Sequence, residues 1–228
     1  MNTQYLVICE GVSECNCLLH LNRLMRALPP PEGCFRSLEF VGLPKTLDAL
    51  TLKRKGVGSG EFGKVVQAYK GEYKRARSAK FLIWVDDDLY VRNDKSCGVN
   101  YERRPAGIPA FSFSTHNFED YLALHLSDEL FELWKSTCSA NDHFSSPLYG
   151  ADYERCFRLV LPDYKKGELP DDFLSLDALQ NMVRHQQKLP AMATGPINRS
   201  RTFAADLAAI LATAYPDVFR DGNCGKSQ

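Results

Sequence analysis

The chain has 228 residues, of which 44% are hydrophobic, enough for one large or two small domains with a packed core. Lys and Arg together number 28, as do Asp and Glu, which excludes a generally basic polyanion-binding protein. No basic segment precedes the first apolar run, and that run is too short to cross a membrane. We therefore expect a cytoplasmic protein with no membrane association.

Eight cysteines are distributed along the chain without a paired Cys-x-x-Cys motif. Cys15 and Cys17, with His20 and Cys34, therefore give only weak support to a structural zinc site. Without a secretion signal, we expect free thiols in a reducing cytoplasm rather than disulfides.

The first predicted element is a buried strand over residues 5–9, a short apolar run that ends in Glu10 and Gly11. Such runs are typical of the inner strands of a parallel sheet, and ligands collect where these strands end. Apolar residues at helical spacing then predict a helix with Ser13 as its N-cap, which stops at the prolines beginning with Pro29.

Strand and helix patterns continue to alternate in the middle of the chain. The next predicted elements are a strand (38–41), a polar loop (53–60), a helix with one apolar face (62–73) and a second buried strand (81–85). This second strand ends in Asp86, Asp87 and Asp88, and strand alternation places Asp86 and Asp88 on the same side. The pattern predicts an α/β fold, a mostly parallel sheet flanked by helices on both faces.

The last part of the chain is mostly helical by pattern. Its predicted elements are a strand over 110–113, a helix capped by Asn117 with Glu119 in its first turn, and helices beginning near residues 128, 151, 175 and 202. We expect a core over residues 1–138 and a helical C-terminal extension over 139–228 that packs on this core.

Basic residues concentrate between Lys53 and Lys80. This stretch contains nine Lys or Arg residues but only two acidic residues, Glu61 and Glu72. Such a run either keeps a surface solvated or contacts phosphates. The nucleic-acid-binding candidates in it are Lys53, Arg54, Lys55, Lys64, Lys74, Arg75 and Arg77.

A glycine-rich stretch over residues 58–65 matches both the kinase Gly-rich loop and the first part of a P-loop. A P-loop needs Ser or Thr after its lysine and a strand upstream, but Val65 follows Lys64 and a basic stretch precedes the glycines. Neither H-R-D nor D-F-G occurs in the chain, which disfavours a kinase.

The acidic residues at the two strand ends favour a metal site. Carboxylates crowded together raise one another's pKa unless a cation holds them, and Mg²⁺ binds through one or two carboxylates plus substrate phosphates. The chain order allows Glu10 to lie beside Asp86 and Asp88. The simpler alternative is that these acids merely begin loops.

Several short motifs, taken in order, carry a family resemblance. They are Glu10-Gly11 with Glu14, Asp86-x-Asp88, Phe118-Glu119-Asp120-Tyr121-Leu122 with His125, Tyr164-Lys165-Lys166-Gly167, and Asn198-Arg199-Ser200-Arg201-Thr202. With these features the chain resembles the Toprim domain of topoisomerases, primases and OLD-type nucleases, and within it the RloB-like proteins of bacteria.

The resemblance implies a Toprim-like fold and a Mg²⁺- or Mn²⁺-dependent nuclease that cleaves RNA, for example tRNA, or DNA. It also implies an antiviral defence effector controlled by an ABC-type ATPase partner. The implied metal ligands are Glu10, Glu14, Asp86, Asp88 and Glu119. The implied catalytic residues are Glu10, Asp86, Asp88 and Glu119, with Lys165 or Lys166 neutralising the scissile phosphate. Glu14 departs from the Asp that many Toprim domains carry at its position.

Other interpretations stay open at this point. The chain could be a non-catalytic Toprim-like sensor or partner-binding module, or, less in keeping with its length, a nucleotidyl transferase. His116 and His125 are more typical of hydrogen-bonded spacers than of catalysts. The apolar faces of the last two helices are compatible with a homodimer.

Overall fold

The computed structural model describes residues 3–9, 11–28, 38–44, 61–86, 107–115, 117–140, 150–166, 168–170, 172–188 and 201–219. The strands in these ranges are β1 (Thr3–Cys9), β2 (Leu38–Pro44), β3 (Lys80–Val85) and β4 (Phe111–Phe113). They form one sheet in the order β2-β1-β3-β4, with every pairing parallel. The predicted mostly parallel α/β fold is confirmed.

Helices follow or separate the strands along the chain. They are α1 (Val12–Ala27), α3 (Glu61–Arg75), α6 (Phe118–Ala123), α7 (Asp128–Ala140), α8 (Gly150–Val160), α9 (Leu176–His185), α10 (Phe203–Ala214) and α11 (Pro216–Phe219). Among the helices described, none has the length and apolar character needed to span a membrane.

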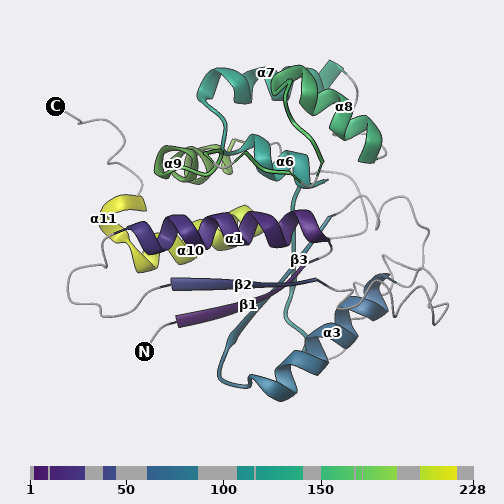
Figure 1. Cartoon of the computed structure of the whole chain (residues 1–228), viewed down its shortest axis with the longest axis vertical. Coiled ribbons are helices and arrows are strands. Elements are labelled where there is room, and N and C mark those ends of the chain that lie inside the picture. Colours follow the sequence, from purple (N-terminus) through teal and green to yellow (C-terminus); the bar gives the residue numbers. More distant parts are fainter. Residues whose placement is uncertain are drawn as a thin grey trace.

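Helices cover both faces of the sheet, as the sequence predicts. Val7 and Trp84 pack in a large hydrophobic cluster with α1 and the later helices, whereas Ile8 and Ile83 pack in a second cluster with α3. Figure 1 shows α3 on one side of the strands and α1 and α10 on the other. Neighbouring residues of one strand thus serve opposite faces because side chains alternate along it.

The contact between α1 and β2 is close and partly polar. Asn22 of α1 exchanges two hydrogen bonds with the backbone of Phe40: its side-chain oxygen accepts from the Phe40 nitrogen at 2.7 Å, and its amide donates to the Phe40 carbonyl. Gly42 lets the helix approach, because a Cβ there would lie 3.1 Å from the Cys15 Cα. These contacts hold the helix that follows β1 in place over the sheet.

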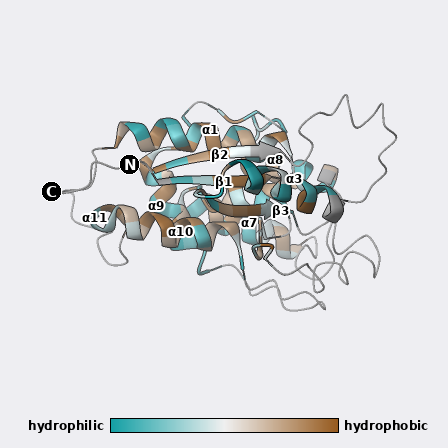
Figure 2. Cartoon of the chain, turned by 90° about the horizontal axis from the view of Figure 1, so that it is seen from below, coloured by the Kyte–Doolittle hydropathy of each residue, from teal (hydrophilic) through white to brown (hydrophobic). Residues whose placement is uncertain are grey.

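Helix α10 packs on the same sheet. The ring of Phe203 in α10 stacks on Trp84 of β3, with centroids 3.9 Å apart and planes 7° from parallel. Phe113 of β4 forms a parallel bridge with Thr202, and its nitrogen donates to the Arg201 carbonyl at 3.1 Å. Figure 2 shows α1 and α10 as separate helices with both hydrophobic and hydrophilic stretches, as expected for helices with one buried face.

Local capping decides where the helices begin. Asn117, Ser175 and Thr202 each accept a hydrogen bond from the first turn of the helix that follows, and the predicted capping by Asn117 is confirmed. The prediction for α1 is wrong by two residues: its N-cap is Gly11, not Ser13. The Glu14 side chain accepts from the Gly11 nitrogen at 3.1 Å, which stabilises the earlier start.

Candidate functional site

The order of the strands selects one edge of the sheet for a ligand site. From β1 the chain moves to β2 on one side and later to β3 on the other, so the direction of winding reverses between β1 and β3. In open α/β sheets, ligands bind at the carboxyl ends of the strands at such a point. Cys9, the last residue of β1, lies opposite Trp84 in β3.

Asp86 directly follows β3 at this edge and is half-buried. Its negative charge raises the pKa of the Tyr164 hydroxyl, which places Asp86 within electrostatic reach of that side chain. Glu10, next in the chain after Cys9, and Asp88 lie outside the described residues, as does His116. Of the predicted strand-end carboxylates, Asp86 is therefore the one that the structure locates.

Glu119 lies in the first turn of α6 and is completely buried. Its Oε1 accepts a hydrogen bond from the Tyr164 hydroxyl at 3.0 Å, while its Oε2 has no hydrogen-bond partner in the described part of the chain. Burial raises the pKa of Glu119 above its ordinary value, and the positive charge of Lys166 and the Tyr164 hydrogen bond act in the opposite direction. Glu119 thus has one oxygen held by Tyr164 and, among the residues described, one buried oxygen without a partner.

Tyr164 bonds to Glu119, lies within electrostatic reach of Asp86 and is held from several sides. Its ring, 2% exposed, packs edge-on against Phe157 with centroids 4.8 Å apart. Its carbonyl accepts from Arg158 Nε at 3.0 Å, and Arg158 in turn pairs with Glu154 at 2.7 Å. Burial raises the pKa of the Tyr164 hydroxyl, as do the charges of Glu119 and Asp86, so this group stays a neutral donor.

The sequence interpretation missed this role of Tyr164. The motif Tyr164-Lys165-Lys166-Gly167 was part of the predicted resemblance, but a role was assigned only to its lysines, because a cation can neutralise a phosphate. A tyrosine 45 residues away from Glu119 carries no local signal of that contact.

The two candidate lysines differ in their surroundings. Lys166 lies close enough to Glu119 for its charge to lower the carboxylate's pKa. Lys165 points to Glu168 instead, with 3.7 Å between the charged groups and 70% of its side chain exposed. Lys166 is therefore the lysine that the structure brings to Glu119.

Glu14, a predicted metal ligand, occupies a capping position. It is 3% exposed, and its Oε2 accepts from the Gly11 nitrogen at the start of α1. Its charge also raises the pKa of the buried thiols of Cys9 and Cys17, whose pKa values burial already raises. The structure gives Glu14 a local stabilising role at the N-terminus of α1.

The predicted nucleic-acid-binding residues that the structure describes lie near the two ends of α3. Helix α3 runs back along the sheet before β3 begins, so Lys64 in its first turn lies toward the end of the sheet that holds Asp86 (Figure 1). Lys74 and Arg75 in the last turn, and Arg77 after it, lie at the opposite end. The remaining candidates, Lys53, Arg54 and Lys55, are outside the described ranges.

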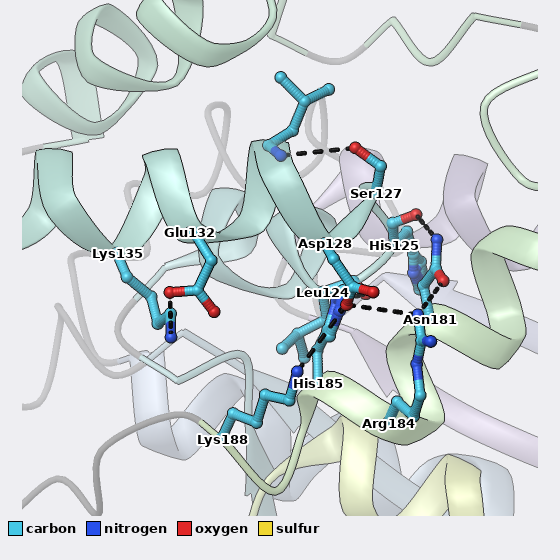
Figure 3. Close-up of polar contacts among 11 residues, drawn as sticks. Leu124, His125, Ser127, Asp128, Glu132, Lys135, Asn181, Arg184, His185 and Lys188 are labelled. Carbon is cyan, nitrogen blue, oxygen red and sulfur yellow. Dashed lines mark hydrogen bonds and ion pairs between the residues drawn. The ribbon is translucent and has the colours of Figure 1, made fainter.

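A second polar cluster lies at the contact between α9 and the corner joining α6 to α7 (Figure 3). The buried His185 ring meets two acceptors: Nδ1 lies 3.1 Å from the Leu124 carbonyl, and Nε2 lies 2.6 Å from Asp128 Oδ1. Arg184 and Lys188 also lie beside Asp128, at 3.4 and 3.8 Å. This cluster connects helices and involves none of the predicted site residues.

His125 is buried in the same region, and neither of its ring nitrogens has a hydrogen-bond partner among the residues described. Burial lowers the pKa of His125 to about 3, and the neighbouring His185 acts in the same direction. A neutral buried imidazole in contact with Tyr121 is consistent with a packing role.

The candidate site thus consists of Asp86, Glu119, Tyr164 and Lys166 in the described part of the chain. Among the described residues there is no group of three or more His, Cys, Asp or Glu residues that could hold a metal ion. Comparison of the chain with protein-family models, with curated proteins and with solved structures found no match. The site's own chemistry therefore carries the functional proposal.

Proposed function

We propose that this protein is a Mg²⁺- or Mn²⁺-dependent Toprim-like nuclease that cleaves phosphodiester bonds in RNA or DNA. The observation that carries the proposal is Glu119, a fully buried carboxylate with one oxygen unpaired among the described residues and the other bonded to Tyr164, which lies within electrostatic reach of Asp86 at the reversal point of a parallel sheet. Burying a carboxylate costs free energy unless a proton or a cation compensates it.

The donor set fits a hard divalent cation. Asp86 and Glu119 offer carboxylate oxygens, the ligands that Mg²⁺ and Mn²⁺ prefer. Glu10 and Asp88, each placed by sequence at a strand end, would complete the site. When bound, the metal supplies Lewis-acid polarisation of the scissile phosphate and a nucleophile at neutral pH.

The protein's own groups would orient and neutralise. Tyr164 holds Glu119 through one oxygen and leaves the other for the metal. The Lys166 ammonium, exposed and close to Glu119, would balance negative charge that develops on the scissile phosphate.

A partner is part of the proposal by resemblance: an ABC-type ATPase that controls the nuclease in antiphage defence in the cytoplasm. Two exposed leucines, Leu133 on α7 (45%) and Leu159 on α8 (67%), offer apolar contacts for a partner or for a second copy of the chain. The same feature favours the second candidate function, a non-catalytic partner-binding module.

The test is cleavage of labelled single-stranded and duplex RNA and DNA by the purified chain with Mg²⁺ or Mn²⁺. Asp86→Asn and Glu119→Gln each remove a charged oxygen donor with little change of shape, and each is expected to lower the rate by about 100-fold or more, equivalent to about 3 kcal/mol. Glu168→Gln, which neutralises an exposed acid nearby, serves as the matched control.

Metal binding is measured separately by calorimetry and by thermal shift. Cleavage by both variants at the wild-type rate would contradict the nuclease proposal. If adding metal gives no heat and no thermal shift, that result would favour the partner-binding module instead.

A further inference from the structure

Five exposed residues in the last two turns of α3 and just after it are not used by the candidate site, and they are here termed the α3 ridge. They are Lys70, Tyr73, Lys74, Arg75 and Arg77. Lys70 and Lys74 lie one helical turn apart and therefore on the same face of α3. Arg75 pairs with Glu72 at 3.0 Å but keeps 75% of its side chain exposed. The ridge presents four positive charges to solvent.

An aromatic ring lies among these charges. Tyr73 is 45% exposed, and its ring stacks on Tyr69 with centroids 5.6 Å apart and meets the edge of Phe81 at 6.0 Å. Tyr69 is itself held, because its hydroxyl donates to the Gly107 carbonyl at 3.1 Å and its ring meets Phe81 at 5.2 Å. Tyr73 is thus supported from beneath while a large part of it faces solvent.

The combination has a specific chemical use. A cationic surface attracts a phosphate backbone, and an exposed aromatic ring stacks on a base whose face is uncovered. In a duplex the base faces are covered by their neighbours, so an aromatic platform of this kind favours an unpaired strand.

The ridge lies at the opposite end of the sheet from Asp86 and on its other face: Ile83 and Val85 pack with α3, so alternation turns Asp86, like Trp84, toward α1 and α10. β3 runs from Lys80 to Val85, and a strand of that length spans about 20 Å. At about 3.4 Å per nucleotide, that separation corresponds to roughly six nucleotides of a stacked strand. Lys64, in the first turn of α3, lies at the same end of the sheet as Asp86.

We propose that the α3 ridge binds an unpaired segment of the nucleic-acid substrate at least about 20 Å from Asp86, so that the protein selects single strands longer than roughly six nucleotides. This inference rests on the proposed nuclease function for its substrate. It adds the strandedness and minimum length of that substrate and a binding surface separate from the carboxylates.

The test measures binding without cleavage. The full chain with Asp86→Asn is titrated in EDTA against fluorescent 20-mer and 5-mer single strands and a 20-mer duplex, in DNA and RNA, at several salt concentrations. The 20-mer single strand is expected to bind at least about tenfold more tightly than the 5-mer or the duplex.

Ridge substitutions separate the charges from the ring. Lys74→Ala with Arg77→Ala should reduce the slope of log affinity against log salt by about 1.4, at about 0.7 per lost phosphate contact. Tyr73→Leu should weaken single-strand binding by about tenfold without changing that slope, and Tyr73→Phe should retain the affinity.

A matched arginine on another helix controls for charge alone. Arg155 of α8 is 72% exposed and pairs with Asp152 at 3.1 Å, much as Arg75 pairs with Glu72. Arg155→Ala should leave binding unchanged, whereas Arg75→Ala should weaken it.

Equal affinity for the duplex or the 5-mer, or ridge variants that bind like the parent, would overturn this inference while cleavage by the wild-type chain still supports the nuclease. The reverse result is equally informative. Ridge-dependent binding without metal-dependent cleavage would retain the surface and reject the nuclease.

Discussion

At the scale of single residues, the hydrogen bond from Tyr164 influences the pKa of Glu119. The tyrosine hydroxyl is the donor that Glu119 Oε1 meets in a site closed to solvent, and it helps to keep the pKa of the carboxyl from rising further. A hydrogen bond to a buried charged group is worth about 1.5–3 kcal/mol. The ionised form of Glu119, which is the form that binds a cation, therefore depends on Tyr164.

Replacing Tyr164 by Phe should raise the pKa of Glu119 further, since the donor that stabilises the ionised carboxylate is lost. Metal affinity is followed by thermal shift from pH 5 to 9. As the pH is lowered, the variant should lose metal affinity at a higher pH than the wild type does. Tyr215→Phe is the control, because it removes a buried hydroxyl near β2, at the other end of the sheet. An unchanged pH profile for Tyr164→Phe would contradict the positioning role.

At the scale of elements, the junction of α6, α7 and α9 is where the stability of the fold depends on pH. Asp128 begins α7 and receives the His185 ring of α9, and this hydrogen bond lowers the pKa of the Asp128 carboxyl. His125 is buried beside them as a neutral ring. Both groups make the junction less stable in acid: Asp128 loses its favourable charge as the pH falls through its lowered pKa, and His125 resists the proton that the unfolded chain accepts.

Between pH 6.5 and about 3, the unfolded chain binds a proton at His125 that the folded chain does not. The free energy of unfolding should therefore decrease as the pH falls through this window, by up to about 1.4 kcal/mol per pH unit from this residue. His125→Phe should remove that slope in urea titrations at several pH values. Phe173→Leu, beside the same ring, should lower stability by a similar amount at every pH; an unchanged slope in His125→Phe would be evidence against a buried neutral His125.

One hydrophobic cluster joins the sheet to the C-terminal helices at the scale of the whole molecule. Trp84 of β3, Trp134 of α7 and Leu207 of α10 all belong to it, and Phe203 lies flat on Trp84. Because the sheet and these helices share one buried cluster, we expect them to unfold together.

Phe203→Ala should destabilise the protein by about 3–5 kcal/mol, because it removes a fully buried ring from contact with Trp84. Urea unfolding should stay a single transition that far-UV circular dichroism and tryptophan fluorescence report alike. Leu159→Ala, at a 67% exposed position of α8, should change stability by less than about 0.5 kcal/mol. Two transitions at different urea concentrations would show that the helices after residue 150 unfold separately.

The sequence by itself determined the features that neighbouring residues encode. The apolar runs at residues 5–9 and 81–85 are strands, and the cap at Asn117 begins α6 as predicted, because periodicity and capping act over one or two turns. The start of α1 was misjudged because Ser13 and Gly11 are both good caps, and the reach of the Glu14 side chain favoured Gly11. The roles assigned to Glu10, Asp88 and the basic residues 53–55 stay predictions.

Only the tertiary structure decided which distant groups meet. It brought Tyr164 to Glu119, set Lys166 rather than Lys165 beside that carboxylate, and placed Lys74 at the opposite end of the sheet from Asp86. These results depend on the direction in which α3 returns along the sheet and on how the chain after α8 folds back over α6. Such contacts arise from packing between elements far apart in the chain, which local sequence patterns do not encode.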